Sequence, residues 1–120
     1  PNARIRSRVY VHPATHSTNP TSGPATAPPY GARLRLRADF PLASLPNEGA
    51  RVVARALQRY GMLLADGGNV ALTARSDRST RARWDGLLGP RDLAAIRPRD
   101  FEMVDGGTRI RYTGDCVRNP

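Results

Sequence analysis

The chain has no lysine, and its 19 strongly basic residues are all arginine. Cys116 is the only cysteine, which excludes an internal disulfide and a cysteine-cluster metal site and leaves one thiol for another chain or segment. No apolar run approaches the roughly 20 residues of a membrane-spanning helix, so we expect no membrane contact. What remains is a basic chain with a formal net charge of +9.

Large apolar side chains are also scarce. Aromatic residues make up 6% of the 120 residues, and Trp84 is the only tryptophan. A domain of this length buries roughly 65% of the surface of its unfolded chain, so its core is small. We expect one folded unit over residues 1–113, followed by a loose tail over 114–120.

The arginine content has two explanations. The planar, forked guanidinium suits phosphate and carboxylate groups, which favours an anionic partner such as nucleic acid or an acidic glycan. Alternatively, a GC-rich coding sequence fills solvated faces with arginine. Because lysine is missing from the whole chain and not from one patch, the second explanation accounts for much of the arginine content.

Arginine occupies every second position in three stretches, at 4–8, 33–37 and 109–111. Since side chains alternate between the two faces of a β-strand, each stretch predicts arginines on one face and apolar residues on the other. We therefore expect strands over 4–12 and 32–40. The proline-rich residues between them predict a long irregular loop.

Residues 47–60 predict the principal helix, with Asn47 as its N-cap and Gly61 as its left-handed end. Its predicted buried stripe is Val53, Ala56, Leu57 and Tyr60, packed on Leu34, Leu36 and Phe40. The predicted fold class is α+β: a mainly antiparallel or mixed sheet with this helix on its apolar face, as part of a larger β-rich fold.

Two Asp-Gly-Gly sequences predict hairpin turns. The first, 66–68, would join strands at 62–65 and 69–74, and the second, 105–107, would join strands at 101–104 and 108–113. Asp66 and Asp105 are interpreted as Asx-type caps of these turns.

His16 and Asp39 are the candidate catalytic residues. His16 suits a general acid/base or a metal ligand completed elsewhere, although a loop histidine bonded to backbone is the favoured explanation. Two histidines, His12 and His16, fall short of the ligands of a zinc site, and no metal is predicted. Asp39 is the one acid among the arginines of its strand, where charge pairing is the alternative role.

Arg33, Arg35 and Arg37 are the candidate substrate-binding residues on that strand, together with Trp84. Trp84 suits either a sugar platform or a core plug, and the core plug is favoured because no other tryptophan is available. The chain has no Walker loop and no GxGxxG sequence, and nothing in it names a cofactor.

Several short blocks share their order with a known family. Residues 54–68 read ARALQRYGMLLADGG, followed by RWD at 83–85 and DFEMV at 100–104, and preceded by YVHPATH at 10–16 and GARLRLRADF at 31–40. These blocks resemble the C-terminal half of a family of secreted, functionally uncharacterised bacterial proteins. The family has tryptophan where this chain has His12, and it has an aromatic pair after the Asp-Gly-Gly turn that is missing here.

The resemblance implies an extracellular location and a larger N-terminal part rich in histidine and acids, which would complete a site around His16. The chain opens on Pro1 and not on methionine, and we expect a processed product or a fragment of something longer.

These observations lead to three hypotheses for function. The first is an extracellular protein that binds or acts on polysaccharide, with hydrolase-type activity completed outside this chain if it is an enzyme. The second is a non-catalytic module that holds an anionic polymer, nucleic acid or acidic glycan, on its arginines. The third is a purely structural half of a larger protein.

Overall fold

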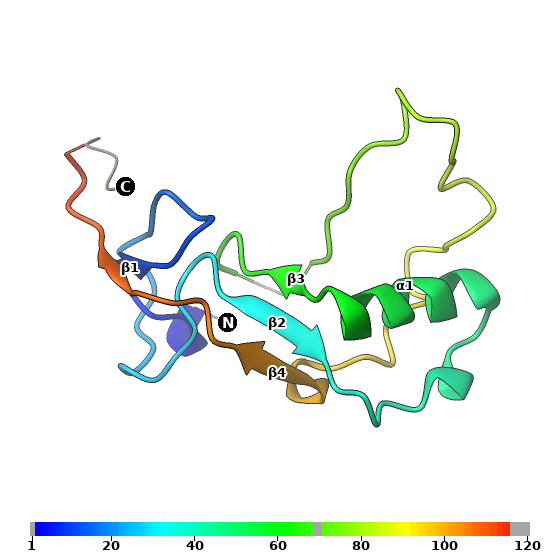
Figure 1. Ribbon diagram of the computed structural model, residues 1–120, viewed down its shortest axis with the longest axis horizontal. Coiled ribbons are helices and arrows are strands. Elements are labelled where there is room, and N and C mark those ends of the chain that lie inside the picture. Colours follow the sequence, from blue (N-terminus) through cyan, green and yellow to red (C-terminus); the bar gives the residue numbers. More distant parts are fainter. Residues whose placement is uncertain (1, 69–70, 116–120) are drawn as a thin grey trace. The chain divides into compact units, whose positions relative to one another are not determined.

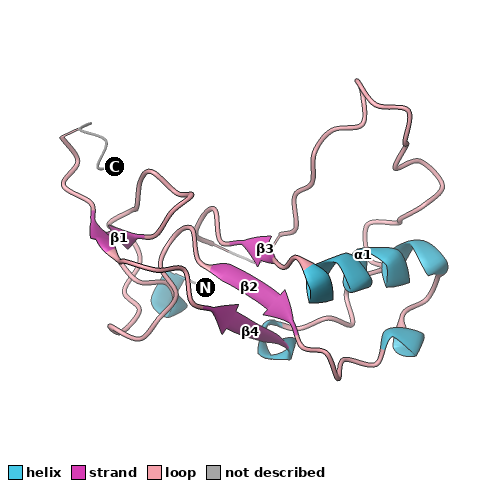
Figure 2. Cartoon of the chain, viewed as in Figure 1, coloured by secondary structure: helices cyan, strands magenta, loops and turns pink. Residues whose placement is uncertain are grey.

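The computed structural model describes residues 2–68 and 71–115, so Cys116 and most of the predicted tail lie outside the described residues. The elements, in chain order, are the 3-10 helix η1 (Asn2–Arg4), β1 (Val9–Tyr10), β2 (Arg33–Leu36), η2 (Leu42–Ser44), α1 (Glu48–Arg59), β3 (Met62–Leu63), η3 (Pro98–Asp100), β4 (Phe101–Val104) and β5 (Ile110–Arg111) (Figure 1). Loops and turns connect these short elements over much of the chain (Figure 2). The predicted α+β class with one main helix is confirmed.

The strands form two sheets. β1 pairs with β5 in an antiparallel ladder, and β2 lies between β3 and β4, antiparallel to β3. The chain divides into two compact units: the first holds 2–34, 62–68 and 103–115 of the described residues, and the second holds 35–61 and 71–102. The division falls within β2 and within β4.

The predicted strand over 4–12 is wrong over most of its length. Its first residue, Arg4, belongs to η1, and Arg8 has a φ of 57°, a left-handed conformation that interrupts the alternation of a strand. Only Val9–Tyr10 forms a strand, while Arg6 makes an isolated bridge to Gly23. The strand predicted over 32–40 is shorter than expected, because the Phe40 N–H bonds the Arg37 carbonyl at 3.2 Å and closes a turn.

The two-faced character of β2 is confirmed. Arg33 and Arg35 are exposed, Leu34 is half-buried and Leu36 is buried. Period-two alternation therefore places the guanidiniums on the solvent side of this strand.

Both predicted hairpins are wrong in their pairing. β3 pairs with β2, and residues 71–74 lie in no strand, while 69–70 lie outside the described residues. β4 and β5 belong to different sheets. The local turn chemistry is correct, since the Asp105 carboxylate accepts a hydrogen bond from the Gly107 N–H at 3.0 Å and Gly107 has a φ of 81°. After the second turn the chain runs into β5, whose partner is β1.

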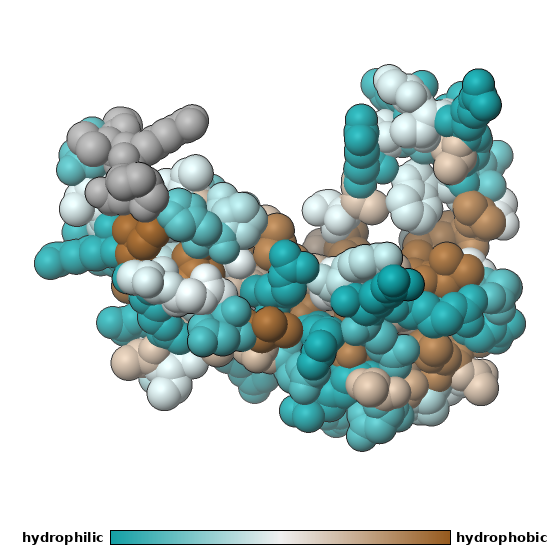
Figure 3. All heavy atoms as spheres, viewed as in Figure 1, coloured by the Kyte–Doolittle hydropathy of each residue, from teal (hydrophilic) through white to brown (hydrophobic). Residues whose placement is uncertain are grey.

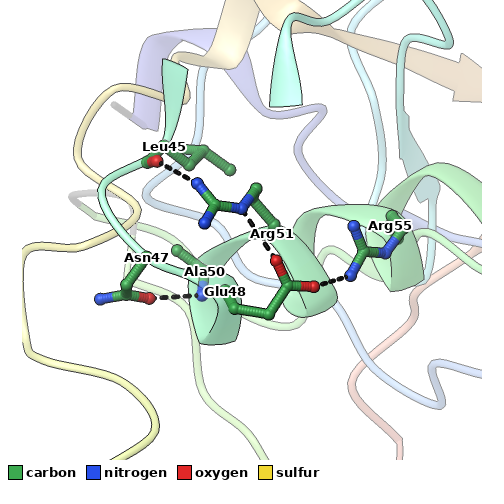
Figure 4. Close-up of polar contacts among 6 residues, drawn as sticks. All are labelled: Leu45, Asn47, Glu48, Ala50, Arg51 and Arg55. Atoms are coloured by element: carbon green, nitrogen blue, oxygen red, sulfur yellow. Dashed lines mark hydrogen bonds and ion pairs between the residues drawn. The ribbon is translucent and has the colours of Figure 1, made fainter. Parts of the chain in front are cut away.

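Helix α1 begins and ends where the sequence predicts. The Asn47 side-chain oxygen accepts the Ala50 N–H at 2.8 Å, and Gly61 follows the helix with a φ of 71° (Figure 4). Its buried side chains are Ala50, Ala54 and Leu57, which share one face at spacings of four and three.

The predicted helix stripe is partly wrong, because Ala56 and Tyr60 are exposed. Tyr60 follows the last helical residue, and the Arg59 guanidinium lies 5.3 Å from its ring centre. The end of the helix is nevertheless fixed to the end of β2, because the Gln58 amide donates to the Arg37 carbonyl at 2.9 Å. Leu36 and Leu45 complete the buried apolar set of this unit.

Two arginines of α1, Arg51 and Arg55, pair with Glu48 in the first turn of the helix. Glu48 accepts a hydrogen bond from Arg51 at 2.9 Å and forms an ion pair with Arg55 (Figure 4). Both bonds hold the pKa of Glu48 below its usual range, and the bond from Arg51 has the larger effect. Arg51 also donates to the Leu45 carbonyl at 3.0 Å, which links the helix to the segment before it.

Gly49 marks a close approach of chain segments in the first turn of α1. A Cβ there would lie 1.9 Å from the Leu87 carbonyl oxygen. The approaching segment is anchored, because Asp92 accepts hydrogen bonds from the Asn47 amide at 2.6 Å and the Gly89 N–H at 2.7 Å. The Gly89 bond, and then the Asn47 bond, lower the pKa of Asp92.

We therefore predict that Gly49→Ala destabilises the protein, although alanine normally stabilises a helix by up to about 1 kcal/mol relative to glycine. Urea unfolding followed by circular dichroism measures the effect. Ala56→Gly, at an exposed position of the same helix, calibrates the ordinary helix preference. An increase in stability for Gly49→Ala would contradict the close packing of Leu87 on α1.

Candidate anion-binding site

Pairing of β1 with β5 brings arginines from the two ends of the sequence together. Val9 lies opposite Arg111 and Tyr10 lies opposite Ile110, and the Tyr112 N–H donates to the Arg8 carbonyl at 2.9 Å. Tyr10 is buried in a cluster with Ile5 and Tyr30, and Ile110 packs against this cluster. Because side chains alternate along a strand, Arg111 then lies on the exposed side of the ladder.

The result is a cleft of about 630 Å³ within the first unit. Its lining residues are Arg6, Ser7, Arg8, Val9, Ala25, Arg109 and Arg111. Four of the seven are arginines and none is acidic. A concave surface lined by four arginines and no acidic residue favours a positive potential, which attracts anionic groups.

The loop predicted to be irregular holds one wall of this cleft in place. Arg6 donates its N–H to the Pro28 carbonyl at 3.0 Å, and the Ser7 hydroxyl donates to the Thr18 carbonyl at 3.2 Å. Gly23 lies so close to this wall that a Cβ there would be 2.6 Å from the Ile5 carbonyl oxygen. The chain at 5–8 is therefore supported by main-chain contacts and not by a regular strand.

The opposite wall is held through an arginine. Arg109 donates from its guanidinium to the Ala25 carbonyl at 2.6 Å. This bond orients one fork of the side chain and leaves further N–H groups for a ligand, because a guanidinium carries five donors. Ion pairs in the described residues join Glu102 to Arg35 and Glu48 to Arg51 and Arg55, and all of these belong to the second unit.

The residues predicted to form a site are divided between the two units. His16 and Arg33 belong to the first, whereas Arg35, Arg37 and Asp39 belong to the second. Arg35 forms an ion pair with Glu102 at 2.7 Å, and Asp39 is exposed in the turn after β2. Their roles in catalysis and substrate binding stay predictions.

A second polar cluster surrounds Tyr30 in the first unit. Buried Tyr30 donates its hydroxyl to Asp66 at 3.0 Å, and the exposed His16 ring lies edge-on to the Tyr30 ring at 5.6 Å. Asp66 also accepts the Gly67 N–H at 2.7 Å, a bond to the next residue and not the bond two residues on that the predicted Asx-type cap makes. The Gly68 N–H donates to the Asn2 side chain at 2.6 Å and fixes the far side of the turn.

This cluster keeps Asp66 ionised. The Gly67 N–H has the largest effect, followed by the Tyr30 hydroxyl and the nearby His16, and together they lower the pKa of Asp66. Burial raises the pKa of Tyr30, and the hydrogen bond to Asp66 raises it further by a smaller amount. Chemically, the cluster offers a carboxylate and an exposed imidazole, with a phenol that keeps its proton at neutral pH.

Sequence reasoning detected the arginines of the cleft but assigned them to separate strand faces. The alternation at 4–8 and 109–111 is visible in the sequence, whereas the pairing that joins the two stretches is not. No local signal indicated the Tyr30–Asp66 bond either, because its partners are 36 positions apart.

Comparisons with protein-family models, curated proteins and solved structures returned no match to this chain. Within 2–68 and 71–115, no three His, Cys, Asp or Glu side chains are grouped as metal ligands. Among the same residues, no helix has the length and apolar character needed to span a membrane.

We predict that Asp66 contributes a pH-dependent part of the stability. Its folded-state pKa is lowered, so the contribution is complete above the unfolded-state pKa of about 4 and is lost as pH falls through the folded-state pKa. The stability difference between the unmodified protein and Asp66→Asn should shrink between about pH 5 and pH 2.

Urea unfolding at a series of pH values measures this difference. Asp85→Asn is the matched control, because Asp85 is exposed and makes no ion pair with the described part of the chain. A stability difference for Asp66→Asn that stays constant across this pH range would contradict the assignment.

Proposed function

We propose that this chain is a binding module for acidic polysaccharide, acting outside the cell, with the arginine cleft as its binding site. The observation that carries the proposal is the convergence of Arg6, Arg8, Arg109 and Arg111 on one cavity whose lining has no acidic residue. Forked guanidiniums bind carboxylate and sulfate groups through paired hydrogen bonds. The extracellular location follows from the family resemblance.

The size of the cleft favours a short stretch of a flexible chain as the bound segment. Its volume of about 630 Å³ lies in the range of roughly 300–1,000 Å³ that is usual for small-ligand sites. Its lining contains no aromatic residue. Proteins that bind single-stranded nucleic acid stack its bases on aromatic side chains, so this composition favours an acidic glycan over such a strand.

Binding is also better supported than hydrolysis. A glycosidase needs a carboxylic acid whose pKa is raised so that it can protonate the leaving oxygen. Among the described carboxyl groups, those with a shifted pKa are Glu48, Asp66 and Asp92, and each is shifted down by hydrogen bonds to its ionised form. Hydrolysis would therefore depend on acids outside this set.

We predict that the double variant Arg6→Ala/Arg111→Ala weakens binding to heparin and polygalacturonate and flattens its salt dependence. Each charged contact removed should lower the slope of log K against log salt by about one, so the double variant should lose about two. Calorimetric or fluorescence-anisotropy titrations at several salt concentrations provide the slope.

The matched control is Arg91→Ala/Arg99→Ala, which removes the same charge at exposed positions outside the cleft. Equal losses in the two double variants would show attraction by net charge alone and would contradict a localised site. Tighter binding to a single-stranded oligonucleotide of equal charge would replace acidic glycan with nucleic acid as the ligand.

A further inference from the structure

The only tryptophan of the chain lies on a loop that is closed by its own hydrogen bonds. In this loop, residues 75–84 of the second unit, the Trp84 N–H donates to the Asp77 carboxylate at 2.8 Å and the Thr80 N–H to the Asp77 carbonyl at 3.1 Å. Arg83 donates to the same carbonyl at 2.8 Å. Asp77 thus organises the loop from its centre.

Further bonds fix the indole itself. The Trp84 ring N–H donates to the Arg75 carbonyl at 3.0 Å, and the Thr80 hydroxyl donates to the Ala82 carbonyl at 2.8 Å just before the ring. Both N–H donors of Trp84 are therefore used inside the loop. The part of the ring that faces solvent can make apolar and π contacts only.

Trp84 is not the core plug that the sequence favoured, because 41% of its surface is exposed. The large apolar residues left exposed in the described chain are Val52, Tyr60, Leu63, Leu72, Trp84, Leu87 and Met103. On the face in Figure 3, hydrophobic residues are interspersed with hydrophilic ones. Trp84 differs from an incidental surface residue because the loop holds its ring in one orientation while leaving it accessible.

The loop carries more positive than negative charge. Arg75, Arg78, Arg81 and Arg83 are all exposed on this loop. Asp77 is its only acid, and its carboxylate accepts the Trp84 N–H. The loop therefore combines one partly exposed aromatic ring with four exposed arginines, against one acid inside it, Asp77, and one directly after it, Asp85.

We propose that loop 75–84 is a second binding site, in which Trp84 stacks against one sugar ring of an acidic glycan while the loop arginines bind its carboxylate or sulfate groups. The ligand class rests on the proposed function. The C–H face of a pyranose ring packs on an indole face, and anionic substituents at the ring edge reach toward cations beside it. One aromatic residue accommodates one ring, whereas nucleic-acid platforms stack successive bases on several.

The inference can be tested in the full chain without any substitution, because Trp84 is the only source of tryptophan emission. Titration with a heparin-derived or galacturonate oligosaccharide should change the intensity or wavelength of that emission and protect it from quenching by acrylamide. Emission and quenching that stay unchanged while calorimetry shows the protein to be saturated would overturn the proposal.

Variants supply the second measurement. Trp84→Ala should weaken binding by about tenfold, which is the size expected for loss of one aromatic stacking contact, while Trp84→Phe should retain most of the affinity. Wild-type affinity in a Trp84→Ala protein that is folded by circular dichroism would also overturn the proposal.

The experiments can overturn either proposal without overturning the other. If Arg6→Ala/Arg111→Ala weakens binding but the Trp84 signal and Trp84→Ala have no effect, the loop proposal fails and the cleft stands. If the Trp84 signal responds while the cleft variant binds normally, the cleft proposal fails and the loop stands. A Trp84 response to oligothymidylate that exceeds the response to the oligosaccharide would reject sugar as the ligand.

Discussion

The antiparallel pairing of Val9-Tyr10 with Ile110-Arg111 is the interaction on which the first unit depends. Tyr10 belongs to the buried cluster with Ile5 and Tyr30, and Ile110 packs against that cluster. Because neighbouring residues of a strand face opposite ways, burying this pair leaves Arg111 on the exposed side. The apolar contact therefore holds like charges close together in spite of their repulsion. An anionic ligand that relieved this repulsion would stabilise the folded state.

Some arginines of the second unit are paired with acids, whereas the lining of the cleft holds arginines and no acid. In the second unit, Glu48 and Glu102 accept ion pairs from Arg35, Arg51 and Arg55. In the first, the cleft gathers four arginines and no acid. A biased composition explains why the basic residues are arginine and not lysine, but it does not explain why acids are present beside one set and absent from the lining of the other. This difference supports a role for the cleft arginines beyond solvation.

The sequence predicted elements whose signals are local. Asn47 and Gly61 bound α1 as expected, and the alternation of Arg33 to Leu36 matches β2. The sequence failed where long-range pairing decides: β5, after the second Asp-Gly-Gly turn, pairs with β1, and residues 71–74, after the first, lie in no strand. Arg8 shows the limit most clearly, because its φ of 57° ends an alternation that looked like a continuous strand. The sequence indicated the arginines of the candidate site, but it did not indicate that the pairing of β1 with β5 brings them together.

In the proposed account, the protein holds an acidic polymer by charge without cutting it. The most direct test is an NMR titration that follows the arginine Nε–H signals while an acidic oligosaccharide is added. The account predicts that the signals of Arg6, Arg8, Arg109 and Arg111 shift first and saturate together. Shifts spread evenly over all arginines, or centred on those of α1, would contradict it.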